Sequence, residues 1–276
     1  MASRAFAPAN ISCIFRVYEH KNPRWVGSYG FGFTINEGII VEASKSKRNE
    51  VVFNNVSTNF PTVISVIKKI TKQKIRLYIK SKLPLGCGFG LSGASALATA
   101  YAINNLLKLK KSNKELAIIA HTAEVKNKTG LGDVVNQYYG GFCVKLKPSS
   151  HFEVKRLPLS NINVYCRYYS RLPTKSVISN IKIRDRINNA AGDSLKEIQK
   201  LIKSNEIKFK NVIKISKEFA VNSGLLKNKQ TIETIKSIEN KHGNASMIML
   251  GNAVFSDKPF EGAAKYKISN QGAYLL

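Results

Sequence analysis

The chain is short of acidic residues. Its 276 residues include only 17 Asp and Glu against 44 Lys and Arg, which gives a formal net charge of +27. A charge of this size makes nucleic acid a partner to consider. The lysines, however, are scattered over the expected helix faces, without an arginine-rich tail or a stripe of alternating basic and aromatic residues. Solvated surfaces or a coding bias explain the charge better than nucleic-acid binding as the main function.

Cysteine and long apolar runs are also scarce. The four cysteines are Cys13, Cys87, Cys143 and Cys166. They form no C-x-x-C pair and no Cys/His cluster, so we expect reduced structural thiols rather than disulfides or a zinc site. No apolar run approaches the roughly 20 residues that span a bilayer, and the N-terminus lacks the apolar core of a secretory signal. We therefore expect a cytoplasmic protein that makes no contact with a membrane.

Length and apolar content predict a two-lobed α+β fold. A hydrophobic content of 43% can bury a sizeable core. We place one lobe at residues 1–155 and a second at 156–276. Short apolar segments predict strands at 11–18, 29–35, 39–43, 74–80, 142–146, 163–169, 246–250 and 263–268. Helical spacing predicts helices at 61–70, 93–109, 112–126, 183–204, 208–222 and 231–241.

A glycine-rich loop at residues 84–94 is the best functional clue. Gly86, Gly88 and Gly90 stand at two-residue spacing, directly before an Ala-rich helical segment. Glycine lets the backbone approach a ligand closely, and the N-terminus of a helix attracts anions. The pattern therefore indicates a nucleotide phosphate site. An ordinary turn from a strand into a helix explains an isolated G-x-G-x-G equally well.

Two carboxylates downstream provide what phosphoryl transfer needs besides a phosphate loop. Glu124 and Asp133 are nine residues apart, across a Gly-x-Gly turn that can bring them together. Mg²⁺ prefers one or two carboxylates, a hydroxyl and substrate phosphates, which Glu124, Ser92 and a nucleotide would supply. Taken separately, a surface Glu and an Asp at a helix start are ordinary features.

Other catalytic patterns are missing or incomplete. There is no G-x-x-x-x-G-K-[ST] loop, no kinase-type D-F-G and no H-E-x-x-H. Ser92 superficially fits a hydrolase nucleophile elbow, but Ala94 stands where that motif requires glycine. His121 shares a helical face with Glu124, but no second pair of this kind completes a metal site, so we interpret His121 as a packing residue.

These motifs together resemble the galactokinase, homoserine kinase, mevalonate kinase and phosphomevalonate kinase (GHMP) superfamily. The resemblance lies in Phe-Gly-Leu-Ser-Gly-Ala at 89–94, Ala-His-Thr-Ala-Glu-Val at 120–125, Thr-Gly-Leu-Gly-Asp-Val-Val at 129–135 and the glycine pair 140–141. Within the superfamily the chain is most similar to the archaeal-type pantoate kinase family. The resemblance implies an N-terminal ribosomal-protein-like α+β lobe and a C-terminal ferredoxin-like lobe, with ATP bound between them.

The resemblance also implies roles for individual residues. Ser92 and Glu124 would bind Mg²⁺, and Asp133 would act on the substrate hydroxyl, either as a base or by positioning it. The reaction implied is phosphorylation of pantoate by ATP to 4-phosphopantoate, a step toward coenzyme A. The family's phosphate-loop positions fall on Gly86, Gly88, Gly90, Leu91, Ser92, Gly93 and Ala94.

The carboxylate of pantoate needs a cationic partner. Lys145 stands where the family tends to carry arginine and is our candidate, with Arg24 and Arg4 as weaker ones; a solvated lysine on an edge strand is the alternative. Asn10 replaces the glycine and basic or histidine pattern of the family, so we expect Asn10 to bind substrate or nucleotide differently. Two other functions stay open: a GHMP-type kinase for another small hydroxy acid or alcohol, such as mevalonate or homoserine, and a non-catalytic nucleic-acid-binding protein. The oligomeric state is open too, a homodimer included.

Overall fold

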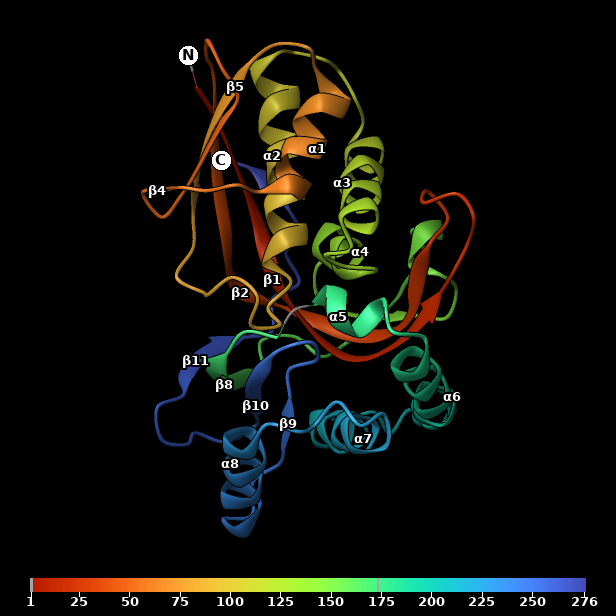
Figure 1. Ribbon diagram of the computed structural model, residues 1–276. Helices are drawn as coiled ribbons and strands as arrows, with labels where there is room; N and C mark the ends of the chain where they lie inside the picture. Colours follow the sequence, from red (N-terminus) through yellow and green to blue (C-terminus); the bar gives the residue numbers. More distant parts are fainter. Residues whose placement is uncertain (1, 173) are drawn as a thin grey trace.

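The computed structural model describes residues 2–172 and 174–276 and has an α+β fold. A large sheet carries the helices of residues 61–139 along one face, and a smaller sheet with the helices of residues 181–240 lies below it (Figure 1). The long first strand, β1 (Ala2–Tyr18), also contacts helices α6 (Ile181–Lys203) and α7 (Phe209–Asn222). The cavity described below lies where the two parts meet.

The large sheet is built around a long antiparallel pair. Its strands are β1 (Ala2–Tyr18), β2 (Gly27–Lys45), β3 (Glu50–Phe53), β4 (Val56–Ser57), β5 (Ile75–Lys80), β6 (Phe142–Lys145), β7 (Lys155–Leu157) and β12 (Tyr274–Leu275). Their order is β12-β1-β2-β5-β3-β4, with β6 paired to β2 and β7. The β1–β2 register shifts between Pro8 and Asn10 and again between Ser12 and Ile14. Such bulges re-aim side chains, and the second lies at the cavity, which Ser12 and Ile14 line.

Helices α1 to α4 cover this sheet and place the site. They are α1 (Pro61–Ile70), α2 (Leu91–Leu106), α3 (Asn113–Asn127) and α4 (Asp133–Tyr139). Helix α2 is buried nearly all round, which its Ala-rich sequence allows because small side chains let the sheet and the neighbouring helices approach closely. At the start of α3, Ser112 accepts a hydrogen bond from the Glu115 backbone N–H and donates its own N–H to the Glu115 carboxylate, which is the expected capping box.

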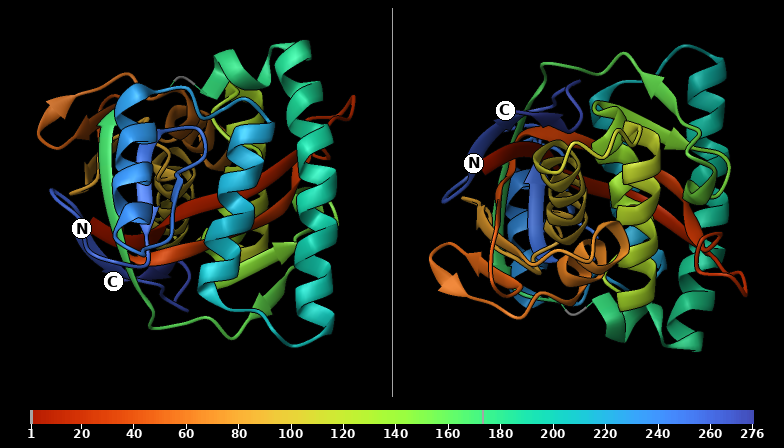
Figure 2. Two further views of the ribbon diagram at one scale, coloured as in Figure 1. Left: turned by 90° about the horizontal axis from the view of Figure 1, so that it is seen from below. Right: turned by 90° about the horizontal axis from the view of Figure 1, so that it is seen from above.

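The second sheet has the ferredoxin-like strand order. Its antiparallel strands are β8 (Asn163–Ser170), β9 (Ala245–Met247), β10 (Asn252–Ser256) and β11 (Ala264–Lys267). The order β11-β8-β10-β9 reads 4-1-3-2 when these strands are counted along the chain. The helices here are α5 (Thr174–Ile178), α6 (Ile181–Lys203), α7 (Phe209–Asn222) and α8 (Lys229–Asn240), and a short 3-10 turn, η1 (Ser149–His151), precedes them. Seen from below, α6 and α7 lie side by side (Figure 2), and both contact β1.

The expected elements are present, but the short elements β3, β4, β7, β12 and α5 have no counterpart among the expected segments, and two longer strands also differ. The segments predicted as separate strands at 29–35 and 39–43 are one continuous strand, β2. Strand β10 was not predicted: it is buried along most of its length, so it shows no alternation of polar and apolar residues, and it follows a glycine. The boundary between the two lobes at 155/156 stays a prediction. Strands β7 and β12 lie at or after this boundary in the sequence, yet both pair with strands of the large sheet.

Two expectations from composition can be compared with the structure. The four cysteines are free and buried. In the described part of the chain, no helix combines the length and the apolar character that crossing a bilayer requires.

Candidate active site

The glycine-rich loop adopts backbone conformations that favour glycine. Gly86, Gly88 and Gly90 have φ values of 79°, 89° and 61°. Gly88 is also closely packed, because a Cβ added there would lie 2.8 Å from the Ile248 side chain and 3.0 Å from the Met249 carbonyl oxygen. The loop is thus held against the 248–251 segment, which comes from the second sheet.

The loop leads into the uncapped N-terminus of α2. Gly90 is the N-cap residue, and no side chain caps this helix, whereas α3, α6 and α8 begin with Ser or Asn caps. Leu91 and Ser92, in the first turn, line a cavity together with the three loop glycines. The first-turn N–H groups of α2 and the helix dipole therefore favour an anion at this end of the cavity.

Glu124 is a buried carboxylate held between two glycines. The side chain is 1% exposed, and a Cβ added to Gly93 or Gly130 would lie only 2.7 Å or 2.5 Å from its Oε2 atom. Thr129 Oγ1 donates to Oε1 at 3.3 Å, while Oε2 has no hydrogen-bond partner among the described residues. Burial and the neighbouring Asp133 raise the pKa of Glu124 to about 8, and the hydroxyls of Thr129 and Ser92 act in the opposite direction. A buried carboxylate oxygen without a partner suits a bound cation.

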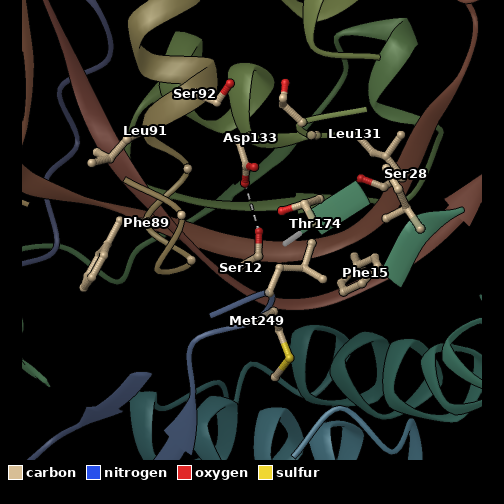
Figure 3. A pocket seen from close by; sticks show the side chains of 18 of the residues that line it. Ser12, Phe15, Ser28, Phe89, Leu91, Ser92, Leu131, Asp133, Thr174 and Met249 are labelled. Carbon is tan, nitrogen blue, oxygen red and sulfur yellow. Dashed lines mark hydrogen bonds between the residues drawn. The ribbon is translucent and has the colours of Figure 1, made fainter. Parts of the chain in front are cut away.

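Asp133 begins α4 and faces the cavity that the glycine loop lines (Figure 3), whereas Glu124 lies against Gly130 and is not part of the cavity wall. Asn10 Nδ2 donates to its Oδ1 atom at 2.6 Å, and Ser12 Oγ donates to the same atom at 3.2 Å. Burial raises the pKa of Asp133, whereas Lys145 and these two donors act to lower it. Among the described residues, both hydrogen bonds to this carboxylate reach Oδ1. The other oxygen is therefore available to a ligand.

Lys145 is buried next to Asp133. Its side chain is 3% exposed, and Nζ donates to Asn136 Oδ1 at 2.9 Å and to the Gly132 carbonyl at 3.5 Å. Burial lowers the pKa of Lys145, and the Asp133 carboxylate opposes that effect. The alternative of a solvated edge-strand lysine is wrong, because β6 pairs with both β2 and β7 and the side chain points into the cavity wall.

Comparison with known proteins shows the family of this chain. Residues 60–141 match the family described as GHMP kinases N terminal domain. The pantoate kinase of Methanocaldococcus jannaschii is 32% identical over 91% of this chain and 90% of its own length. The chain belongs to the GHMP kinases.

Two further proteins are similar to this chain over nearly its whole length. The pantoate kinase of Thermococcus kodakarensis is 29% identical over 97% of this chain and 91% of its own length. A solved structure described as a phosphotransferase related to the CoA biosynthesis pathway is 26% identical, covers 100% of this chain and 98% of its own, and superposes with a TM-score of 0.85. This GHMP kinase thus has the same fold as that phosphotransferase along its whole length.

Three other residues singled out in the sequence do not line the cavity of this GHMP kinase. Asn10 is fully buried behind Asp133, to which it is hydrogen-bonded, and is not part of the cavity wall. Arg24 donates to the Ser150 carbonyl at 2.8 Å and lies over the Trp25 ring, away from the cavity. Arg4 forms an ion pair of 3.8 Å with Glu42 in the sheet. Of the three basic candidates, the structure brings Lys145 to the site.

Sequence reasoning missed several residues of the site. Ser12 donates a hydrogen bond to Asp133, Asn136 donates one to Asn10, and Ser28 lines the cavity near Lys145. A weak signal for the first two exists in the sequence: Ser12 lies two residues after Asn10 in an otherwise apolar strand, and Asn136 lies one helical turn after Asp133. The second part of the chain closes the cavity with Thr174, Ile178, Met249 and Leu250.

His121 packs as expected. Its ring is fully buried, lies edge-on to Phe152, and donates from Nε2 to the Val26 carbonyl at 2.9 Å. Burial lowers the pKa of His121 to about 4, so the ring is neutral at neutral pH.

Proposed function

We propose that this GHMP kinase transfers the γ-phosphoryl group of ATP to the 4-hydroxyl group of pantoate, with Mg²⁺ as cofactor. The observation that carries the proposal is the convergence of Ser92, Glu124 and Asp133 around the N-terminus of α2. The similarity to pantoate kinases over nine-tenths of the chain supports this choice of acceptor.

The glycine loop and the first turn of α2 would bind the triphosphate. Gly86, Gly88 and Gly90 keep side chains out of the way, so that backbone N–H groups reach the phosphate oxygens. These groups are fixed before ATP binds, because the loop is packed against the 248–251 segment. They would therefore stabilise charge on the transferring group without reorganising.

Glu124 and Ser92 would hold Mg²⁺. The unpartnered Oε2 atom of Glu124 and the neighbouring hydroxyl are the hard oxygen ligands that Mg²⁺ prefers. When bound, the cation supplies positive charge to the phosphates during transfer. The pKa of Glu124 is raised in the protein without a cation. A bound divalent cation would favour the ionised carboxylate and lower this pKa.

Asp133 would orient the acceptor hydroxyl and take up its proton. Asn10 and Ser12 fix Oδ1, so Oδ2 is held in one direction toward the cavity. Lys145 lies close enough to favour the charged form of Asp133, which the hydroxyl needs as its hydrogen-bond acceptor.

Lys145 would also anchor the carboxylate of pantoate. An ammonium group has three N–H donors, and Asn136 and the Gly132 carbonyl occupy two of them. The third is left for the substrate. Apolar side chains line the same cavity and suit the two methyl groups of pantoate: Ile14, Phe15, Leu131 and Ile178.

A panel of acceptors tests the proposal. The purified chain is mixed with ATP, Mg²⁺ and pantoate, mevalonate, homoserine or shikimate, and ADP release is followed by a coupled assay. We expect turnover with pantoate, lost in Asp133→Ala and Glu124→Ala variants that still fold. Turnover of mevalonate or homoserine without turnover of pantoate would assign this site to another acceptor.

A further inference from the structure

An unbroken line of hydrogen bonds joins Lys145 to Asp133 beneath the cavity floor. Lys145 Nζ donates to Asn136 Oδ1 at 2.9 Å, Asn136 Nδ2 donates to Asn10 Oδ1 at 2.8 Å, and Asn10 Nδ2 donates to Asp133 Oδ1 at 2.6 Å. The four residues come from β6, α4 and β1, and the two asparagines are fully buried. Neither asparagine lines the cavity.

The two ends of this line fix its direction. An ammonium group can only donate, so Asn136 must turn its carbonyl oxygen toward Lys145 and its amino group toward Asn10. A carboxylate can only accept, so Asn10 must present its amino group to Asp133. The charges at the two ends therefore determine both amide orientations. With these orientations the Asn136 amino group meets the Asn10 carbonyl oxygen, so the central hydrogen bond also forms.

The surroundings leave the asparagines little freedom to turn. A Cβ added to Gly32 would lie 3.2 Å from Asn136 Nδ2, and one added to Gly90 would lie 3.2 Å from the Asn10 Cβ and from the Asp133 Cγ. Pairing is regular from Asn10 to Ser12, so these two residues point to the same face of β1 and both donate to the same carboxylate oxygen. The Asp133 side chain is thus held by Ser12, which lines the cavity, and by Asn10, which does not.

We propose that Asn136 is a positioning residue of the phosphoryl transfer: through Asn10 it ties the Asp133 carboxylate to the Lys145 ammonium and holds the free Asp133 oxygen at the angle the acceptor hydroxyl requires. The proposal rests on the proposed function, in which Asp133 acts on that hydroxyl. Asn136 contacts no substrate and acts through its two neighbours.

The first test is a double-mutant cycle on kcat. We expect Asn136→Ala and Asn10→Ala each to lower kcat about 10- to 100-fold, because a misplaced catalytic group loses rate steeply. KM for ATP and for the acceptor should change less than about threefold. The double variant should be no slower than the worse single variant, since either change breaks the same line. Effects on kcat that multiply, or a rise in KM with kcat intact, would overturn the proposal.

A second variant keeps the shape and changes only the hydrogen bonding. Asn136→Asp still accepts from Lys145 but cannot donate to Asn10, so Asn10 must reverse its amide and present its oxygen to Asp133. We expect kcat to fall at least as far as in Asn136→Ala. A wild-type kcat in Asn136→Asp would show that Asn136 only fills space. The control is Asn104→Ala, which removes a part-buried asparagine near the far end of α2, bonded to the Lys111 backbone; its kcat should be unchanged.

A measurement without substrates separates this proposal from the proposed function. In the NMR spectrum of the ligand-free protein, one side-chain amide proton of Asn10 should lie downfield of those of exposed asparagines, because it bonds a carboxylate at short distance. In Asn136→Asp this signal should return to the ordinary range. A signal that is ordinary in the wild type, or unchanged in the variant, would refute the line of hydrogen bonds, whichever acceptor the enzyme uses.

Discussion

The Glu124 carboxylate packs against Gly93 and Gly130, and it has room only because both residues lack a side chain. One added methyl group should therefore displace it. A Cβ on residue 130 would lie 2.5 Å from Oε2 and 2.8 Å from both Cδ and Oε1, well inside ordinary van der Waals contact. All three carboxyl atoms are crowded at once, so rotating the carboxylate does not relieve the overlap. In Gly130→Ala the carboxylate must retreat by about 0.9 Å to reach an ordinary 3.4 Å contact.

A displacement of this size should reduce activity more than stability. Misplacing a group of the site by about 1 Å costs on the order of 100-fold in rate. The atoms that move are the end of a long side chain, and φ of residue 130 lies outside the left-handed region, so alanine is tolerated by the backbone. We expect kcat/KM to fall about 100-fold and the free energy of unfolding to change by no more than about 2 kcal/mol.

The assay is coupled ADP release with pantoate, measured over a range of Mg²⁺ concentrations, together with urea unfolding of the same samples. The Mg²⁺ concentration at half-maximal rate should rise in Gly130→Ala. The matched control is Gly192→Ala in α6, where an added Cβ meets nothing within 4 Å; it should keep full activity and gain up to about 1 kcal/mol of stability. If the two variants have the same rate and the same Mg²⁺ requirement, the assignment of Glu124 to the cation is refuted.

Three further predictions concern single residues. Asp133→Asn should lower kcat about 1,000-fold while calorimetric ATP binding persists, because general-base and orienting roles contribute at this level; an active Asn variant would exclude the role given to Asp133. Gly88→Ala combines φ +89° with a Cβ that would lie only 2.8 Å from the Ile248 side chain, and it should lose about 1–3 kcal/mol of stability in urea unfolding; wild-type unfolding would contradict the loop packing. His121 has a folded pKa of about 4 against an ordinary 6.5, so the unfolded chain binds a proton that the folded chain rejects, and stability falls as pH drops through this window. Between pH 7 and pH 5, His121 should account for about 2 kcal/mol of the fall in the free energy of unfolding. The fall in His121→Gln should therefore be smaller than in the wild type by about 2 kcal/mol; equal falls would show that the buried ring does not control the effect.

The parts of the site that depend on local pattern were predictable from the sequence. Three alternating glycines before an Ala-rich helix predict a bare backbone turn, and the left-handed φ values of Gly86, Gly88 and Gly90 agree with it. The helix at 61–70 begins at a proline and keeps its apolar spacing, so its bounds match the expectation. Local chemistry decides both features.

The parts that depend on distant pairing were not predictable. Asn10 and Asp133 are 123 residues apart, and no local pattern indicates that the bulged strand brings an amide to that carboxylate. The burial of Lys145 is not expected from the sequence, because lysine seldom lies buried. Its burial results from β6 pairing on both sides and from partners at Asn136 and Asp133, which the folded chain alone brings together.

The most direct test of the account is the identity of the phosphorylated product. The chain is incubated with ATP, Mg²⁺ and pantoate, and the new phosphate ester is examined by ³¹P NMR with proton coupling. Transfer to the 4-hydroxyl predicts a phosphorus signal split into a triplet by the two methylene protons of C4. A doublet, from the single proton at C2, or no ester at all alongside turnover of another acceptor, would contradict it.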